Sequence, residues 1–310
     1  MGVGRGTAHS LTMANVEAMY WVASEETGNA SWLGQVASTF TTDQPQEEYP
    51  WLGANPAVRK WEGERTAQEL RGDKIILVND DYEATIEFKR KELRRDKTGQ
   101  VQARIGELAD RMAQLPQKLL TALILANGTA YDGTAFFGSH TVGDSGTIDN
   151  AMTNADGGLA GGSTPTTAQM AANILAMVSR LMGFKDDQGE PMNEYARSFL
   201  VMVSPNLLGA TLGAINDQFL SSGGANTLKS TGWSIDVAAN PRLTSTNVAY
   251  LFRTDARVRP FIYQEELHEL ESLGEFSEHA FKTNRCQFGA HISGAAGYGR
   301  FEYAIQGTLA

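Results

Sequence analysis

Two periodic patterns of apolar residues dominate the first half of the chain. Between residues 82 and 88, apolar and polar side chains alternate, a period of two that predicts a strand with one buried face. The apolar run 74–78 precedes this segment, and Asn79-Asp80 between the two is a turn signal. The pattern therefore predicts a long β-hairpin that is charged on one face and needs a second surface to lie on.

From residue 101 onward the period becomes that of a helix. Apolar side chains three or four positions apart predict an amphipathic helix over residues 98–127, about 40 Å long at ~1.5 Å per residue. Pro116 lies inside this helix and is expected to kink it or to remove a hydrogen bond. The residues that set the period are Val101, Ile105, Leu108, Met112, Leu115, Leu119 and Leu123.

The remaining segments predict shorter elements. Residues 1–50 indicate an extended arm with a helix-compatible piece, held by the body of the chain or by a neighbour. Residues 128–164 are rich in Gly, Ser, Thr, Asp and Asn and predict a long loop. Without a regular βαβ alternation, the fold class is α+β. Further helices are expected from residues 166 and 205, and strands over 199–203, 233–237, 248–252, 261–264, 280–292 and 301–306.

Charge is distributed unevenly over the 310 residues. The net charge is −10, yet residues 59–111 carry 13 Lys/Arg and 12 Asp/Glu and are nearly neutral. A charge-dense segment of mixed sign is typical of a solvated face or of a surface that pairs with a complementary one. The acidic balance of the whole chain argues against a general nucleic-acid binder, which would carry a basic stripe.

Cysteine use and hydropathy narrow the protein class. Cys286 is the only cysteine, which excludes an intrachain disulfide scaffold, and its place in an apolar strand indicates a small buried side chain. No segment reaches the roughly 18–20 apolar residues that cross a bilayer. Residues 1–6 lack the apolar core of a signal peptide, so we expect a soluble protein made in the cytosol.

The census of chemical motifs is largely negative. The histidines show no metal-ligand spacing, and there is no phosphate-binding loop. Residues 143–146 resemble the nucleophile loop of trypsin-like proteases, which leaves a hydrolase using Ser145 with His140 as an alternative, although no β-barrel pattern surrounds them. We therefore predict no catalytic residue, no metal and no cofactor. The five histidines are His9, His140, His268, His279 and His291.

Several segments, taken in order, resemble the Mu-type phage major head subunit family. The first are Trp51-Leu-Gly with Asn55-Pro56, and Trp61-Glu-Gly-Glu-Arg65, followed by the charged segment 74–89. The run 131–140, Tyr-Asp-Gly-Thr-Ala-Phe-Phe-Gly-Ser-His, resembles the loop after that family's long helix. Residues 289–299 and 301–307 resemble its C-terminal end.

This resemblance implies the Hong Kong 97 phage capsid fold and divides the chain accordingly. Residues 1–50 would form the N-terminal arm, and 51–97 the extended loop with its β-hairpin. Residues 98–164 would hold the spine helix and a loop of the peripheral domain. Residues 165–262 would form the axial domain, and 263–310 the return strands of the peripheral domain.

The resemblance also implies a function. The chain would be the major capsid protein of a tailed bacteriophage or prophage, forming hexamers and pentamers of an icosahedral shell around double-stranded DNA. Its partners would be other copies, a portal, a scaffold and decoration proteins, with DNA enclosed without sequence-specific binding and no membrane. Assembly would occur in the host bacterial cytoplasm, and the final location would be the virion. An encapsulin-like compartment is the structural alternative.

The charged segment and its flanks supply the candidate contacts between subunits. Opposite-sign complementarity across a neighbour would set register, whereas cohesion would come from apolar anchors. For Trp51 and Trp61, packing within one subunit is the alternative role. The full candidate set is Trp51, Trp61, Arg65, Lys74, Asp81, Glu83, Glu87, Lys89 and Arg90.

Overall fold

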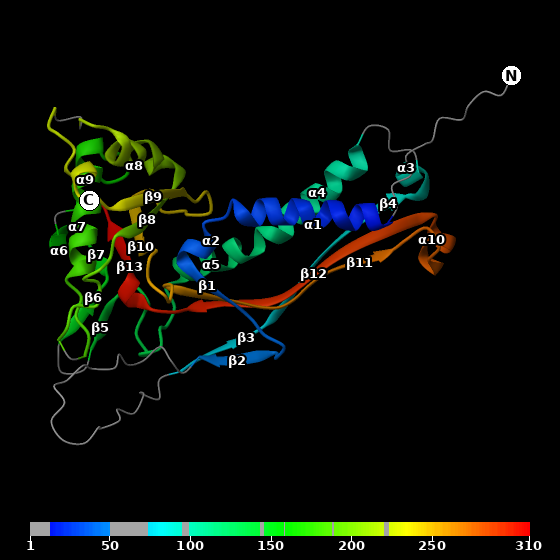
Figure 1. Cartoon of the computed structure of the whole chain (residues 1–310), viewed down its shortest axis with the longest axis horizontal. Helices are drawn as coiled ribbons and strands as arrows, with labels where there is room; N and C mark the ends of the chain where they lie inside the picture. The colour runs from blue at the N-terminus through cyan, green and yellow to red at the C-terminus, as the bar shows by residue number, and fades with distance from the viewer. Residues whose placement is uncertain are drawn as a thin grey trace, which may run out of the picture.

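The computed structural model is an elongated molecule with two parts, a compact lobe that holds the C-terminus and a long arm (Figure 1). The structure describes residues 13–49, 74–94, 99–142, 146–157, 159–187, 189–219 and 223–310. The predictions for Trp51, Trp61, Arg65 and Ser145 lie outside these residues. The α+β class is confirmed, because helices and mixed sheets alternate irregularly along the chain.

The arm is built on a four-stranded sheet with the order β1-β11-β12-β4. Its two longest strands, β11 and β12, pair antiparallel and run from the compact lobe to the tip of the arm (Figure 1). The short helix α10 connects them at that tip. The bounds are β1 Ala37–Thr41, β4 Asp80–Lys89, β11 Phe261–Leu273, α10 Glu278–Thr283 and β12 Arg285–Tyr298.

Helices α4 and α5 lie along this sheet and correspond to the predicted long helix. The expected effect of Pro116 is confirmed, because the helix is interrupted at Gln114 and α5 restarts with Pro116 in its first turn. Apolar residues such as Ile105 and Leu108 face the sheet and are buried. The bounds are α4 Gln100–Ala113 and α5 Leu115–Ala126.

The helix-compatible piece of the predicted N-terminal arm is confirmed, because residues 13–29 form helix α1 (Met13–Asn29), which packs along α4. Val16 and Tyr20 are fully buried, and the hydroxyl of Tyr20 lies 2.9 Å from Nε2 of His268 on β11. Weak periodicity hid this contact, because α1 buries only a narrow stripe. The short helices α2 (Leu33–Val36) and α3 (Arg90–Arg94) follow α1 and β4.

The predicted hairpin is wrong in its strand pairing, although both of its strands exist. Strand β3 (Ile75–Val78) pairs with β2 (Gln46–Tyr49), and β4 pairs with β12, so the two strands do not pair with each other. At Asn79 the chain leaves the ribbon of β2 and β3 and continues into β4 without a turn. The side-chain nitrogen of Asn79 donates a hydrogen bond of 2.9 Å to Glu266. The apolar face of β4 needs a sheet neighbour and a helix to cover it, and β12 and α4 supply them.

The compact lobe contains a five-stranded sheet with the order β7-β13-β10-β8-β9. Helices α7 and α8 pack against it, and the helix expected from residue 166 is confirmed as α7, with Thr166 as its N-cap in a capping box with Gln169. The bounds are β5 Ser139–Thr141, β6 Thr147–Asp149, β7 Ala151–Met152, α6 Asn154–Gly157, α7 Thr167–Met182, β8 Ser198–Val203, α8 Pro205–Asn216, α9 Thr227–Ser230, β9 Ser234–Ala239, β10 Val248–Arg253, the 3₁₀ helix η2 Phe301–Tyr303 and β13 Ala304–Thr308.

Strand pairing crosses one of the predicted domain borders. Strand β13 was assigned with residues 263–310 to the peripheral domain, yet it pairs with β10 and β7 of the compact lobe. The C-terminal strand thus closes the sheet that residues 165–262 begin. The division into axial and peripheral domains stays a prediction.

Candidate functional site

The most exposed charged surface predicted from the sequence lies on the arm. Along β4 the side chains of Glu83, Thr85, Glu87 and Lys89 are exposed, whereas Phe88 is buried against α4 and β12. This alternation confirms that one face of the strand is charged. The register places Glu83 opposite His291 of β12, and His291 opposite Glu269 of β11, so the same face continues across three strands.

We call this surface the arm face. It comprises the outward side chains of β4, β12 and β11 and is predominantly acidic. The defining residues are Asp81, Glu83, Glu87, Lys89, Glu269, Glu271, Arg285 and His291.

Glu87 is the best-connected carboxylate of the arm face. It accepts hydrogen bonds from Arg285, from Nε2 of His279 at 3.1 Å and from Nε2 of Gln287 at 3.2 Å. The bond from Arg285 is the main reason why the pKa of Glu87 lies below its ordinary value. Nearby, Nε2 of His291 lies 3.4 Å from Asp81. These contacts hold the charged groups in register without burying them.

Two other predicted contact residues lie away from the arm face. Lys74 forms an exposed ion pair of 2.8 Å with Glu48, across the ribbon made by β2 and β3. That ribbon is fixed to the arm by a buried hydrogen bond of 2.8 Å from the hydroxyl of Tyr49 to Gln264. Arg90 is half-buried at the end of β4, with its Nε atom buried. The structure therefore groups Asp81, Glu83, Glu87 and Lys89, but not Lys74 or Arg90.

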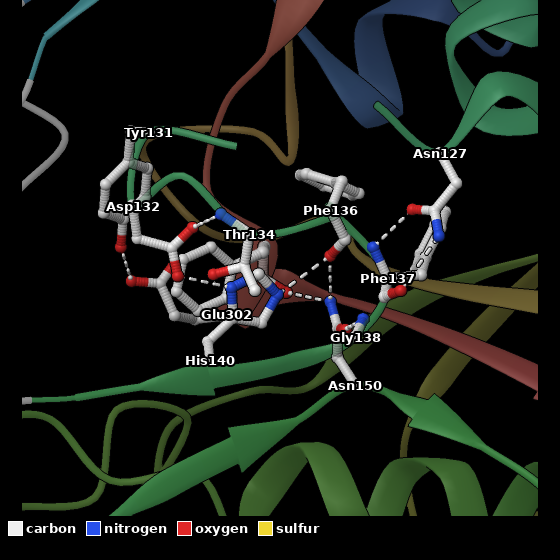
Figure 2. Close-up of polar contacts among 11 residues, drawn as sticks. Asn127, Tyr131, Asp132, Thr134, Phe136, Phe137, Gly138, His140, Asn150 and Glu302 are labelled. Atoms are coloured by element: carbon white, nitrogen blue, oxygen red, sulfur yellow. Dashed lines mark hydrogen bonds and ion pairs between the residues drawn. The ribbon is translucent and has the colours of Figure 1, made fainter. Parts of the chain in front are cut away.

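The segment that carries the family resemblance after the long helix lies at the junction between arm and lobe and buries Phe136, Phe137 and His140. Figure 2 shows His140 with both ring nitrogens engaged: Nδ1 lies 2.7 Å from Oδ2 of Asp132, and Nε2 lies 3.1 Å from the carbonyl oxygen of Phe136. The imidazole also stacks on the ring of Phe301, with 3.6 Å between ring centroids. Both neighbours are hydrogen-bond acceptors, so each ring nitrogen already has a partner within the fold.

This arrangement gives no support to the hydrolase alternative. A general base needs a ring nitrogen that faces the nucleophile, whereas His140 is fully buried and both of its ring nitrogens contact other groups of the fold. Burial opposes ionisation of Asp132, but hydrogen bonds from Thr134 and His140 hold its pKa below the ordinary value. The contact between Asp132 and His140 is therefore part of the structure of the junction.

A second carboxyl group, that of Glu302, lies in the same cluster (Figure 2). Its Oε1 accepts a hydrogen bond of 2.9 Å from the hydroxyl of Tyr131, and Arg300 lies 3.8 Å from the same oxygen. Glu302 is completely buried, and burial raises its pKa. The cluster thus joins the loop after α5 to the turn before β13.

Asparagine amides complete this junction. Asn127 pairs with the backbone of Phe137 through both its oxygen and its nitrogen, at 2.6 and 2.9 Å. Asn150 accepts from the nitrogen of Gly138 and donates to the carbonyl oxygens of Phe136 and Phe301. Since the buried backbone groups of the loop are satisfied in this way, the conformation of the loop is fixed.

The described part of the chain offers no other chemical centre. It contains no group of three or more His, Cys, Asp or Glu side chains placed to hold a metal ion. Cys286 is fully buried in the arm, as predicted. Among the same residues, no helix combines the length and apolar character needed to span a bilayer.

Sequence reasoning missed the tip of the arm. Residues 280–292 were expected to form one strand, but the strand starts at Arg285, and helix α10 precedes it with the exposed ring of Phe281. The signal was present: Ser277 caps α10 by accepting from the nitrogen of Ala280, and Asn284 ends it in a left-handed conformation.

Comparisons with known proteins bear on both parts of the molecule. The model of the family described as Mu-like prophage major head subunit gpT matches residues 12–167, half of the chain. The major capsid protein of Escherichia phage Mu is 27% identical over 109 residues, 34% of this chain and 36% of that protein. The matched region thus spans about a third of the length of that relative.

Solved structures extend the likeness to almost the whole chain. A chain of the bacteriophage JBD30 procapsid is 18% identical with a TM-score of 0.51, covering 97% of this chain and 77% of that one. A capsid chain of the native GTA particle is 14% identical with a TM-score of 0.55, covering 99% and 95%. At these identities the likeness establishes the fold, and the predicted Hong Kong 97-type capsid fold is confirmed. With its residues 12–167 matched, the chain belongs to the Mu-like prophage major head subunit gpT family.

Proposed function

We propose that this chain is the major head subunit of a tailed phage or prophage and assembles, through hexamers and pentamers, into an icosahedral shell. The observation that carries the proposal is the arm face, a charged surface held out from the compact lobe on a sheet with its own small core. Membership of the head-subunit family supports the same role. The subunit would be structural, with no catalytic residue.

The physics of the arm face suits repeated weak contacts. Exposed ion pairs stabilise an interface by only about 0–1 kcal/mol each, so no single pair of the arm face would hold two copies together. Complementary charges instead select the partner surface and its register. Rings and shells arise when one surface of a copy binds a different surface of the next, and the same contact then repeats.

The charge of the chain fits a container for DNA. Residues outside 59–111 carry 13 Lys/Arg and 24 Asp/Glu, an excess that disfavours tight binding to phosphates. We propose that the shell encloses double-stranded DNA without holding it. A portal, a scaffold and decoration proteins would be the other partners, with assembly in the host cytoplasm and the virion as the final location.

Imaging of the purified full-length chain tests the proposal. Negative-stain microscopy and sedimentation velocity are expected to show shells, tubes or ring-shaped capsomers. Monomers at every salt and protein concentration would contradict the proposal. Particles isolated from infected or induced cells should contain double-stranded DNA, whereas particles that contain a cargo enzyme without nucleic acid would favour the encapsulin-like alternative.

Charge reversal tests the role of the arm face separately. In Glu83→Lys/Glu87→Lys the exposed charges of β4 are inverted without touching Phe88, so the subunit should fold and fail to complete shells. Glu194→Lys makes a similar change on the exposed surface of the compact lobe and is the matched control. Deleting residues 75–88 would be less clear, because it removes β3 and most of β4 from their sheets.

A further inference from the structure

Two phenylalanine rings stand almost completely in solvent at the tip of the arm. Phe276 is 95% exposed and Phe281 is 88% exposed, the highest values among the large hydrophobic side chains in the described residues. Exposed aromatic rings on a protrusion are unfavourable in water, and such residues are typical anchors of protein interfaces.

Phe281 is held out rigidly. It lies on α10, whose first turn is capped by Ser277 and whose end is fixed by Asn284 in a left-handed conformation. The preceding residue, Ala280, is buried, and the neighbouring His279 contacts Glu87 on the arm face. Because the helix is capped at both ends, a partner that binds Phe281 has little backbone entropy to remove.

The same chain carries an apolar hollow that could receive a ring. It lies between α1 and α4 and has a volume of about 360 Å³. Val22 on its edge is 57% exposed. Apart from Glu26, the residues that line it are small, apolar or uncharged: Ala18, Met19, Val22, Ala23, Gln102 and Gly106.

Gly106 keeps this hollow open. It lies in the interior of α4, where glycine disfavours the helix relative to alanine. A Cβ atom added at Gly106 would meet nothing within 4 Å, so neither tight packing nor an unusual backbone angle within this chain requires glycine there. The hollow and the glycine beside it are both explained if another molecule fills the hollow.

The ring and the hollow of one chain cannot meet. Figure 1 shows α10 at the free end of the arm, beyond the ends of both α1 and α4. Opposite charges near the ring and the hollow favour a contact between the ring of one copy and the hollow of another. Helix α1 carries three glutamates and no Lys or Arg, and Glu26 borders the hollow. Lys282, next to Phe281, is 67% exposed, and its surface pair with Glu278 is weak enough to exchange partners.

We propose that Phe281 of one copy inserts into the hollow between α1 and α4 of the next copy, with Lys282 facing Glu26. The contact is heterologous, so it propagates around a ring or across a shell instead of ending at a dimer. The inference rests on the proposed function, because it names one of the contacts by which head subunits would join.

Photo-crosslinking tests the contact in assembled particles. The full-length chain carries p-azidophenylalanine at position 281, which keeps the ring, and is mixed with isotopically labelled wild-type chain before assembly. After irradiation, mass spectrometry should find links from position 281 to residues 18–26 or 102–106 of the other copy. The same probe at Phe219, an exposed ring of the compact lobe, should give no such link. Links from position 281 to other segments, or none, would overturn the proposal.

Filling the hollow provides a second test with its own folding control. Gly106→Leu places a side chain in the space without removing a contact, so the subunit should melt at the wild-type temperature or above. Crosslinks from position 281 should fall at least tenfold, while Gly106→Ala, a smaller filling, should reduce them less. Unchanged crosslinking in folded Gly106→Leu would refute the contact. Shells that form without this crosslink would leave the proposed function intact, whereas absence of wild-type particles would remove both.

Discussion

In the compact lobe, β8 and β10 bury almost every side chain, whereas in the arm β4 exposes every second one. The lobe strands lie inside a five-stranded sheet that is covered by helices, so they contain nearly continuous apolar runs. Strand β4 lies at the edge of the arm sheet and has one apolar and one charged face. The lobe therefore has the large core, and the arm carries the surface available to partners.

This division explains why the family resemblance after the long helix involves buried residues. The junction segment 131–140 contains Phe136, whose ring lies 5.0 Å from those of both Phe261 and Tyr298. Both partners belong to the base of the arm strands, so the junction transmits the orientation of the lobe to the arm. A stiff junction is what a repeated subunit contact at the arm tip requires.

The largest expected contrast is between two phenylalanines. Phe199→Ala in β8 removes a fully buried ring and should destabilise the fold by about 3–5 kcal/mol. Phe281→Ala at the arm tip removes an exposed ring and should leave the free energy of unfolding of the subunit unchanged. Urea denaturation of unassembled subunits measures both. Comparable losses would mean that the arm tip is part of the subunit core, against the division described above.

At the junction, Asp132→Asn should cost about 1–3 kcal/mol, because it removes the charge that the buried His140 faces. The amide oxygen can still accept from the backbone nitrogen of Thr134, so the turn itself should persist. Thermal melting measures the loss. Asp236→Asn, an exposed carboxylate of β9, is the control and should melt like wild type. An equally stable Asp132→Asn would show that the contact between Asp132 and His140 does not hold the junction.

Glu302 gives a prediction on pH dependence. Burial raises its pKa in the folded state above the value in the unfolded chain, so folding takes up a proton. Its contribution is therefore present at low pH and is lost as the pH rises through the folded pKa, at up to about 1.4 kcal/mol per pH unit. Glu302→Gln should flatten this fall at pH values above the ordinary pKa of a glutamate. If the melting temperatures of the two proteins change with pH in the same way, burial does not raise the pKa of Glu302.

The smallest effect on subunit stability is expected on the arm face. Glu87→Gln weakens the contacts with Arg285 and His279, which are exposed and in exchange with water. The melting temperature of the subunit should not change measurably, while the salt dependence of assembly should. Light scattering at several ionic strengths measures the salt dependence of assembly, and the matched variant in the lobe is Glu194→Gln. A clear loss of melting temperature would assign Glu87 to the fold instead.

Local patterns predicted the individual elements well and their pairing poorly. The alternation along β4 and the interruption near Pro116 depend on neighbours within a few residues, and both were predicted. The hairpin failed because Asn79-Asp80 resembles a turn locally, whereas the true partner of β4 is some 200 residues away along the chain. The alternation of apolar residues along β12 was visible in the sequence, but this pattern does not indicate which strand pairs with β12.

The candidate site was likewise predictable only in part. The charged face of β4 follows from its period, but its continuation through His291 and Glu269 depends on the register of three distant strands. In the sequence, His140 showed no metal-ligand spacing and was considered only as the base of the hydrolase alternative. Its partner Asp132 is eight residues away, yet the stacking ring of Phe301 and the nearby Glu302 come from the far end of the chain. Long-range packing, not local chemistry, decided its role.

The central claim is that copies of this chain join through their arms while each compact lobe keeps its own core. A cryo-electron microscopy map of particles assembled from the full-length chain tests this most directly. The account predicts a closed shell in which every arm face and every α10 tip lies against a neighbouring copy, with the five-stranded sheet contained within one chain. A shell whose contacts run through exchanged strands of the compact lobe, with the arm faces open to solvent, would contradict it.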